Sequence, residues 1–395
     1  MTIYVYILIA VGVYISLYVL YNYMLLLTRF IIKEKQMTLP LTQTRFCVII
    51  PAHNEELLLK RLLMSIQKQD YPRELYKAIV IADNCDDNTA RIGLENSAQV
   101  FERRDDLHRG KGYAIKFALE RVDMKEYDAL FIIDADSVTG DDLLRQLDTA
   151  MRKGARIIQC YNGVANPDES WFTRLLDVSR TIGNEILLPA KQKLGLSSNL
   201  MGNGMCFTST ILVKYGWDAF TVGEDWEYYA KLVQSGETVA FANRARVYHQ
   251  ESSSLKQATS QRMRWSSGRF AVIWKYGLGI FSSGLKEMNL KKVDASLPLL
   301  FPNPSLGINL TAVCFLLSIM LLLTSGEYIY FWWFLSLILI QVFIFLVGIL
   351  YTRNKFKNFL SLFVAPLFLV WKIGIDILSA LGLGRKEWVR TQRKL

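Results

Sequence analysis

Charge-free apolar segments lie near both ends of the chain, and short apolar and polar runs alternate between them. No charged side chain occurs in residues 3–27, 295–326 or 328–351. A helix of about 20 apolar residues spans the roughly 30 Å hydrocarbon core of a bilayer. Three prolines interrupt the start of the second segment. We therefore predict membrane helices over 3–27, 305–323 and 328–351, with an external turn at 324–327.

The charges beside these segments predict their orientation. Arg29, Lys33 and Lys35 follow the first segment, so the positive-inside rule places the N-terminus outside and the next domain in the cytoplasm. A cleaved signal peptide would carry basic residues before its apolar run, so we interpret this one as an uncleaved anchor. Residues 359–383 are also apolar but contain a proline and two charges. Because a span there would put the basic tail 385–394 outside, we expect an interfacial or re-entrant helix.

Strands and helices alternate between the anchors. Strands are predicted at 46–50, 78–82, 98–101 and 129–133, and helices at 55–69, 88–96 and 112–122. This alternation predicts an α/β fold with a mostly parallel sheet, covered on both faces, that binds ligands at the carboxyl ends of its strands. The predicted organisation is an anchor at 1–28, a linker at 29–44, a catalytic domain at 45–257, an amphipathic interfacial region at 258–294, two membrane helices in 295–351, and an interfacial or re-entrant helix with a cytoplasmic basic tail at 352–395.

Composition narrows the class of protein. Of 395 residues, 51% are hydrophobic, and the formal net charge is +10. The basic residues adjoin apolar segments, which favours an anionic membrane face over nucleic acid. Five scattered cysteines form no C-x-x-C pair, and there are three histidines. This usage argues against a zinc site or a disulfide framework and fits a reducing compartment.

Asp134-Ala135-Asp136 follows a predicted buried strand and is the strongest chemical signal. A nucleotide sugar has a diphosphate leaving group, and a divalent cation neutralises the charge that builds as it departs. Carboxylate oxygens suit Mg²⁺ or Mn²⁺. One of the two carboxylates would face the metal and the other the sugar or ribose, and we predict Asp136 as the metal ligand and both as part of the nucleotide-sugar site. The alternative is a polar turn after a strand.

Two other strand ends carry polar residues for a nucleotide. Asp83 ends the second strand and can accept hydrogen bonds from a base or ribose, while Asp86 and Asp87 can instead cap the next helix. The first strand leads into Ala52, His53 and Glu55, which we expect to hold the nucleotide. The alternative is a helix N-terminus with Asn54 as its cap; both can hold at once.

A basic turn and an acidic one complete the predicted centre. Lys111 lies in Arg109-Gly110-Lys111-Gly112, where backbone N–H groups and the ammonium can meet phosphate. Asp225 in Gly223-Glu224-Asp225 is the predicted base, because a sugar hydroxyl must lose its proton as the bond forms. Glu224 is assigned to the acceptor and diphosphate region. The alternatives are a flexible basic loop and an acidic first helical turn.

Gln261-Arg262-Met263-Arg264-Trp265 begins a segment with basic and apolar faces, which is typical of a helix lying on a bilayer. Arg264 can also reach a diphosphate, and Trp265 can stack on a sugar ring.

Together these motifs resemble the inverting family 2 glycosyltransferases of GT-A fold. The Gln261, Arg264 and Trp265 element looks like that of the membrane-bound synthases of cellulose, chitin, hyaluronan and poly-N-acetylglucosamine. The resemblance covers about residues 45–276. It implies that Asp83 contacts the nucleobase and that Gln261, Arg264 and Trp265 hold the diphosphate and acceptor. Gly202 and Asn203 lie where these synthases line the acceptor terminus, although the local sequence departs from theirs.

The resemblance implies transfer from a UDP-sugar to a growing β-linked polysaccharide at the cell membrane. Transfer of one sugar to a lipid-linked or glycan acceptor is the first alternative, and a catalytically silent sensing subunit is the second. Membrane lipids, a second copy of the chain or an accessory export subunit are the expected partners, and nucleic acid is not.

Overall fold

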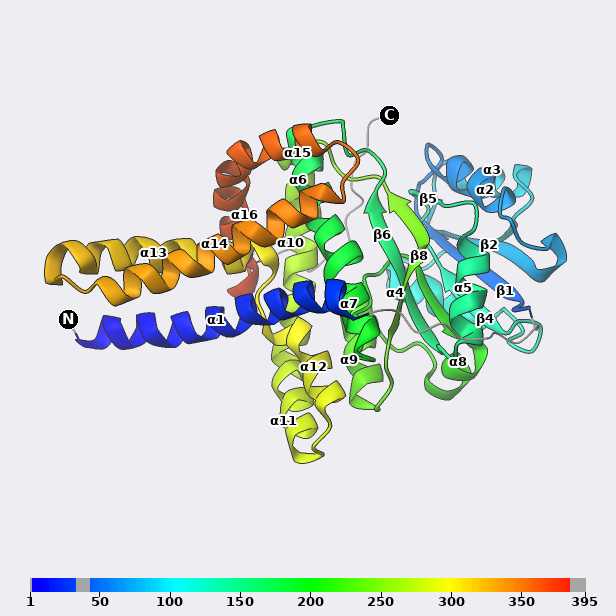
Figure 1. The fold of residues 1–395 in the computed structure, drawn as a ribbon. Helices are drawn as coiled ribbons and strands as arrows, with labels where there is room; N and C mark the ends of the chain where they lie inside the picture. Colours follow the sequence, from blue (N-terminus) through cyan, green and yellow to red (C-terminus); the bar gives the residue numbers. More distant parts are fainter. Residues whose placement is uncertain (1, 33–42, 384–395) are drawn as a thin grey trace.

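The computed structural model describes residues 2–32 and 43–383 (Figure 1). A sheet covered by helices forms one part, and long apolar helices project from it. Most of the predicted linker, including Lys33 and Lys35, and the basic tail from residue 384 lie outside the described residues.

Eight strands form one mixed sheet in the order β3-β2-β1-β4-β7-β6-β8-β5. They are β1 (Phe46–Ala52), β2 (Tyr76–Asp83), β3 (Gln99–Arg103), β4 (Ala129–Ile132), β5 (Ser137–Thr139), β6 (Ile157–Val164), β7 (Met205–Thr208) and β8 (Ala240–His249). The four strands predicted from the sequence are β1 to β4, which pair in parallel. In the other half β6 and β8 are also parallel, but β7 is antiparallel to β4 and β6, and β5 is antiparallel to β8.

Helices cover both faces of the sheet. They include α2 (Leu59–Gln67), η1 (Arg73–Leu75), α3 (Thr89–Glu95), α4 (Lys111–Leu119), α5 (Leu143–Arg152), α8 (Ser209–Tyr215) and α9 (Glu224–Gln234). Alternate residues of β1 enter two cores: Cys47 and Ile49 pack with α4 and α9, whereas Val48 and Ile50 pack with α2 and α5. A strand covered on both faces has this continuous apolar run.

The helix predicted at 55–69 begins only at Leu59, and Asn54 is not its cap. Asn54 adopts a left-handed φ of 55°, and its side-chain oxygen accepts a hydrogen bond from Asp86 N at 2.8 Å. The N–H of Glu55 donates to Thr89 Oγ1 at 2.8 Å. Residues after β1 therefore brace the loop after β2, which keeps these two strand ends together.

Three apolar helices, α1 (Thr2–Ile31), α13 (Pro304–Ser325) and α14 (Tyr328–Leu350), run side by side away from the sheet (Figure 1). They contain the three predicted membrane segments except Tyr351, which follows α14, and each is long and apolar enough to cross a bilayer. Their packing is close: an added Cβ at Gly12 would lie 2.8 Å from Trp333, and one at Gly307 would lie 2.6 Å from Tyr18.

A fourth candidate span covers Lys355–Ala380. It consists of α15 (Lys355–Ser361), η4 (Leu362–Val364) and α16 (Ala365–Ala380). In Figure 1, α16 runs crosswise to α13 and α14, next to α10. The length of residues 355–380 permits a membrane span, whereas the crosswise course of α16 is the one expected of an interfacial helix. The interfacial helix therefore stays a prediction.

The remaining helices connect the sheet to the membrane helices. They are α6 (Trp171–Thr181), the π-helical η2 (Ile182–Leu187), α7 (Leu188–Lys193), α10 (Leu255–Val272), the π-helical η3 (Ile273–Gly277), α11 (Leu278–Lys286) and α12 (Leu290–Leu300).

Candidate active site

A cavity of about 780 Å³ lies at the carboxyl ends of β1, β2 and β4. Thirteen of the fourteen predicted site residues line it: Ala52, His53, Glu55, Asp83, Lys111, Asp134, Asp136, Gly202, Glu224, Asp225, Gln261, Arg264 and Trp265. The exception, Asn203, is buried below the lining; its Oδ1 accepts from the N–H of Asp134 at 3.0 Å and its Nδ2 donates to Ser137 Oγ at 2.9 Å. Asn203 thus holds the loop that carries Asp134 and Asp136.

One end of the cavity is formed where β1 and β2 finish. His53 Nδ1 lies 2.7 Å from the Asp83 carbonyl oxygen. The Asp83 carboxylate accepts from Arg103 Nη1 at 2.6 Å and from Asn84 Nδ2 at 3.2 Å. Burial raises the pKa of Asp83, and Arg103 opposes that rise. Arg103 ends β3 and was not predicted from the sequence; it fixes the orientation of the Asp83 carboxylate.

The two neighbouring aspartates have different roles in the structure. Asp87 Oδ1 accepts from the N–H of Thr89 at 2.9 Å, at the first turn of α3. Asp86 instead pairs with Arg104 at 2.8 Å on the surface. The N-cap residue of α3 is Asn88, so neither aspartate is the cap, although the Asp87 carboxylate binds the first backbone N–H of the helix.

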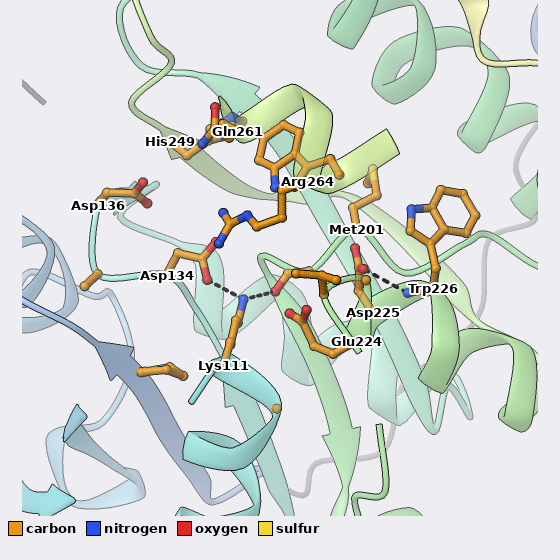
Figure 2. Close-up of a pocket in the computed structure, with 18 of the residues that line it drawn as sticks. Lys111, Asp134, Asp136, Met201, Glu224, Asp225, Trp226, His249, Gln261 and Arg264 are labelled. Carbon is orange, nitrogen blue, oxygen red and sulfur yellow. Dashed lines mark hydrogen bonds and ion pairs between the residues drawn. The ribbon is translucent and has the colours of Figure 1, made fainter. Parts of the chain in front are cut away.

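Lys111 is the positive centre of the cavity floor. It begins α4 after Gly110, whose φ of 128° suits glycine. Its ammonium pairs with Asp134 and donates to the Gly202 carbonyl (Figure 2). Burial lowers the pKa of Lys111, but Asp134, Glu224 and Asp225 outweigh burial, so the pKa is raised overall. The lysine therefore stays charged where a phosphate would enter.

Glu224 and Asp225 begin α9 and point into the cavity (Figure 2). Burial raises the pKa of Glu224 to about 7 and that of Asp225 to about 6. The charge of Asp225 adds to the rise of the Glu224 pKa, and the charge of Lys111 opposes the rise for both groups. Asp225 Oδ1 accepts from the N–H of Trp226 at 2.8 Å. A carboxylate with a raised pKa is a stronger base, so this pair suits proton transfer near neutral pH.

The face of α10 toward the cavity carries Gln261, Arg264 and Trp265. Arg264 reaches from α10 toward Asp134 (Figure 2). Gln261 is 8% exposed, and its Oε1 has no hydrogen-bond partner among the described residues. Since buried acceptors are nearly always paired, this atom is suited to a ligand hydroxyl.

The other basic residues of α10 contact protein. Arg262 donates to Glu251 at 2.7 Å, and its guanidinium lies 4.6 Å from the Trp265 ring centre. Arg269 donates to the carbonyls of Pro298 and Phe301, both at 2.8 Å. The predicted basic face is thus largely used inside the protein, whereas Trp274 is 77% exposed. Contact of this region with a bilayer stays a prediction.

Sequence reasoning missed one wall of the cavity. We call it the helical wall: Leu176, Ser179 and Arg180 of α6, Gly183 and Asn184 of η2, and Leu188 of α7. Asn184 is tied to the β6 backbone by a bond to the Asn162 carbonyl at 3.0 Å. No motif marks this wall, but the π-helical turn within it is a feature that often accompanies functional sites.

His249 belongs to a buried network beside this wall. Its Nδ1 lies 2.9 Å from Asn162 Oδ1, and its Nε2 lies 2.9 Å from Glu251 Oε1. Glu251 also accepts from Arg180 at 3.1 Å and from Arg262. Both ring nitrogens thus have protein partners, which is typical of a histidine with a structural role.

A backbone contact links the acidic turn to α10, and it yields a prediction. An added Cβ at Gly268 would lie 2.7 Å from Gly223 N. Gly268→Ala should therefore displace the turn that carries Glu224 and Asp225 and lower kcat at least about tenfold, because a misplacement of about 1 Å can cost 10²-fold. Gly279→Ala in α11, where nothing lies within 4 Å, should leave kcat unchanged. Equal kcat for the two variants would show that the contact does not position the turn.

The acidic loop between β4 and β5 fits a cation completed by its ligand. Among the described residues no group of three or more His, Cys, Asp and Glu side chains could hold a metal. Mg²⁺, however, is commonly held by one or two carboxylates plus substrate phosphates. Asp134 and Asp136 both line the cavity, so they supply the hard oxygen donors that such a cation needs.

Comparison with known proteins gives consistent matches. A family model described as "Glycosyltransferase like family 2" matches residues 44–268. The chain is 24% identical to the "Probable glycosyltransferase YdaM" of Bacillus subtilis (strain 168), over 58% of this chain and 56% of that protein. It is 24% identical to the "Beta-monoglucosyldiacylglycerol synthase" of Trichormus variabilis, over 60% of this chain and 51% of that protein. The chain spans about half the length of the curated relatives it matches.

A solved structure has a similar fold. It is described as "Mannosyltransferase PcManGT from Pyrobaculum calidifontis in complex with GDP-Man and Mn2+". The identity is 16% and the TM-score is 0.56, over 94% of this chain and 99% of that one. The similarity therefore includes the helices outside the sheet.

Proposed function

This chain belongs to the glycosyltransferase-like family 2, and from that premise we propose that it is an inverting transferase that moves one sugar from a UDP-sugar to a hydroxyl acceptor at the membrane. Its fold is of the GT-A type, as predicted. The observation that carries the proposal is the convergence of the predicted motifs on one cavity, with Lys111 opposite a pair of carboxylates of raised pKa.

The proposed donor site lies along the ends of β1, β2 and β4. Asp83, held by Arg103, accepts hydrogen bonds from the base or ribose, and Ala52, His53 and Glu55 line the same end. Lys111 and Arg264 face the diphosphate. When a nucleotide binds, its phosphate replaces Asp134 as the partner of the Lys111 ammonium, because both groups are anions.

The proposed chemical step uses the acidic turn. Asp225 takes the proton from the acceptor hydroxyl as its oxygen attacks the anomeric carbon and the bond to the diphosphate breaks. The nucleoside diphosphate leaves with the electron pair of that bond. Attack opposite the leaving group inverts the anomeric configuration. Gln261 Oε1 accepts from a sugar hydroxyl, and Trp265 stacks on a sugar ring.

Asp136, with Asp134, would hold Mg²⁺ or Mn²⁺ together with the diphosphate. The cation would supply positive charge to the departing diphosphate. The structure titled with Mn²⁺ and GDP-Man is a relative in fold, and this supports a divalent metal here without choosing the ion.

Metal-dependent nucleotide binding tests this proposal. We expect UDP to bind the purified protein in detergent at least about tenfold more weakly in excess EDTA than with Mn²⁺, a loss of about 1.4 kcal/mol. Asp136→Asn should show the same weakening even with Mn²⁺ present. Asp141→Asn, an exposed residue of the turn between β5 and α5, is the matched control and should bind normally. UDP affinity that is identical with EDTA and with Mn²⁺ would contradict the metal site.

The acceptor has two candidate forms. The sequence resemblance favours elongation of a β-linked polysaccharide. Such a polymer would need an export route, which a second copy of the chain or an accessory subunit would supply. The relative named for a glucosyldiacylglycerol supports the alternative, transfer of one sugar to a lipid.

We further propose that the catalytic domain faces the cytoplasm, with α1, α13 and α14 crossing the membrane. In intact cells a membrane-impermeant maleimide should label Glu327→Cys, in the turn between α13 and α14, but not Lys60→Cys on α2. The five native cysteines are buried, so their background labelling should be low. Labelling of Lys60→Cys with protection of Glu327→Cys would reverse the orientation.

A further inference from the structure

The helical wall of the cavity has no partner in the proposed donor chemistry. We infer that it is the acceptor site, and that the acceptor is a hydroxyl-bearing membrane lipid whose acyl chains remain in the bilayer. This inference rests on the proposed function and chooses between its two acceptor forms.

The helical wall is continuous with the membrane helices. On α6 and η2, Arg180 and Gly183 line the cavity, whereas Val178, Ile182 and Ile186 face the opposite way. Those three residues pack in one cluster with Leu26 of α1 and with Ile344 and Ile349 of α14. An added Cβ at Gly348 of α14 would lie 2.3 Å from Ile182. A single helix therefore separates the cavity from the bundle predicted to cross the membrane.

The opposite wall has the same relation to the crosswise helix. Gln261 and Trp265 of α10 line the cavity. Ser266, the next residue, donates to Asp376 of α16 at 3.1 Å and accepts from Lys372 at 3.0 Å. Thr259 Oγ1 of α10 accepts from Trp371 Nε1 at 3.2 Å. Both walls at the acceptor end of the cavity thus pack, on their other face, against apolar helices. α6 and η2 pack against α1 and α14, and α10 packs against α16.

The outer face of the segment formed by α15, η4 and α16 is suited to contact with lipid. Along α15, η4 and α16, and directly after α16, the residues Phe356, Phe363, Val370 and Leu381 are 68–76% exposed. Large exposed apolar patches mark membrane or partner contacts. Because this face continues from the membrane bundle through α13, a bilayer at the bundle would also meet α16. The acceptor side of the cavity would therefore lie at the level of the lipid headgroups.

The chemistry of the cavity requires a hydroxyl on that lipid. Leu176 and Leu188 supply apolar surface in the helical wall. The acidic turn provides the base that a hydroxyl needs before it attacks. A glycerolipid headgroup with a free hydroxyl combines these features, since its polar end is short and its chains need not leave the membrane.

The packing of the bundle disfavours the polysaccharide alternative for this chain alone. α1, α13 and α14 form one close-packed core in which Phe334 is fully buried and Gly12 lies against Trp333. A polymer that crossed the membrane through this bundle would have to separate these helices, whereas a lipid product would not need to cross it.

A side chain placed in the helical wall tests this inference. Nothing lies within 4 Å of an added Cβ at Gly183, so Gly183→Phe should project into the cavity. The purified protein is placed in vesicles of phosphatidylcholine with dioleoylglycerol, and incubated with Mn²⁺ and a radiolabelled UDP-sugar panel. Label in the organic phase and released UDP are measured separately. Gly183→Phe should lower the ratio of lipid label to released UDP about tenfold, which corresponds to about 1.4 kcal/mol.

Two controls keep the outcomes distinct. Gly279→Phe, also in open space but on α11, should keep the wild-type ratio. Gly183→Ala adds only one methyl group and should fold as the wild type does, with a smaller fall in the ratio. Organic-phase label with a lower ratio in both Gly183 variants supports the inference. Released UDP without lipid label, polymer as the product, or an unchanged ratio in Gly183→Phe overturns it. Absence of UDP release from the wild type with every donor overturns the proposed function instead.

Discussion

Asp225→Asn should lower kcat by about 10²–10⁴-fold, the usual effect of losing an acid–base group. The substitution removes proton acceptance while almost preserving volume, so the hydrogen bond from Trp226 N can be retained. Affinity for UDP should barely change, because Lys111, Asp134 and Asp136 are untouched. Single-turnover kinetics and UDP titration measure the two quantities. Asp218→Asn is the matched control: its side chain is 61% exposed and pairs with Lys231 outside the cavity, so its kcat should be normal.

The pH dependence adds a second measurement of the same group. Burial raises the pKa of Asp225 to about 6, and a base acts only when it is deprotonated. Activity should therefore be full above that pH and fall as the pH drops through it, at a higher pH than an exposed aspartate of pKa about 4 would give. Near-normal kcat in Asp225→Asn would contradict its role and point to Glu224, whose pKa is also raised.

Glu251→Gln should destabilise the protein by about 3–5 kcal/mol, because removing one partner of a buried ion pair leaves the other uncompensated. The Glu251 carboxylate is 1% exposed and binds Arg180 of α6 and Arg262 of α10, so it joins two walls of the cavity. Thermal unfolding in detergent should show a fall of roughly 10 °C at the usual 2–4 °C per kcal/mol.

The sign of the pH effect follows from the same network. Burial alone would raise the pKa of Glu251, but Arg262, His249 and Arg180 hold it well below the ordinary carboxyl range. Its stabilisation is therefore present above the unfolded pKa of about 4.3 and is lost as the pH falls toward the lower folded value. Glu95→Gln is the control, because its pair with Arg91 is exposed and worth at most about 0.5 kcal/mol. Equal unfolding temperatures for the two variants would show that Glu251 does not hold the walls together.

The first half of the fold could be predicted because each element has a local signal. Phe46 to Ile50 is a short continuous apolar run that ends at a proline, which identifies β1 by its length, and the leucines of α2 recur at helical spacing. Parallel strands end at one edge, which is why residues as far apart as Asp83 and Asp134 could be assigned to one site.

The second half had weaker local signals. β5 has three residues and β7 has four, which is too short for a periodic pattern. Their antiparallel pairing with β8, β4 and β6 depends on tertiary contacts. The start of α2 was missed because Asn54 bonds to the loop after β2, a contact that spacing does not reveal.

The acidic and basic motifs of the site were visible in the sequence, but their supports were not. Arg103 and Asn203 hold Asp83 and the acidic loop through bonds across the sheet. The helical wall carries no charged motif and becomes part of the site only because η2 packs between the cavity and α14. Residues that act by position rather than by type leave little trace in one sequence.

Donor turnover tests the central claim most directly. The purified protein in detergent, with Mn²⁺ and a lipid extract from its host membrane, is incubated with a panel of UDP-sugars, and released UDP is measured for the wild type, Asp225→Asn and Asp218→Asn. The account predicts UDP release from at least one donor, an inverted anomeric configuration in the product, and loss of release only in Asp225→Asn. No release from any donor by the wild type, or equal release by the wild type and Asp225→Asn, would contradict it.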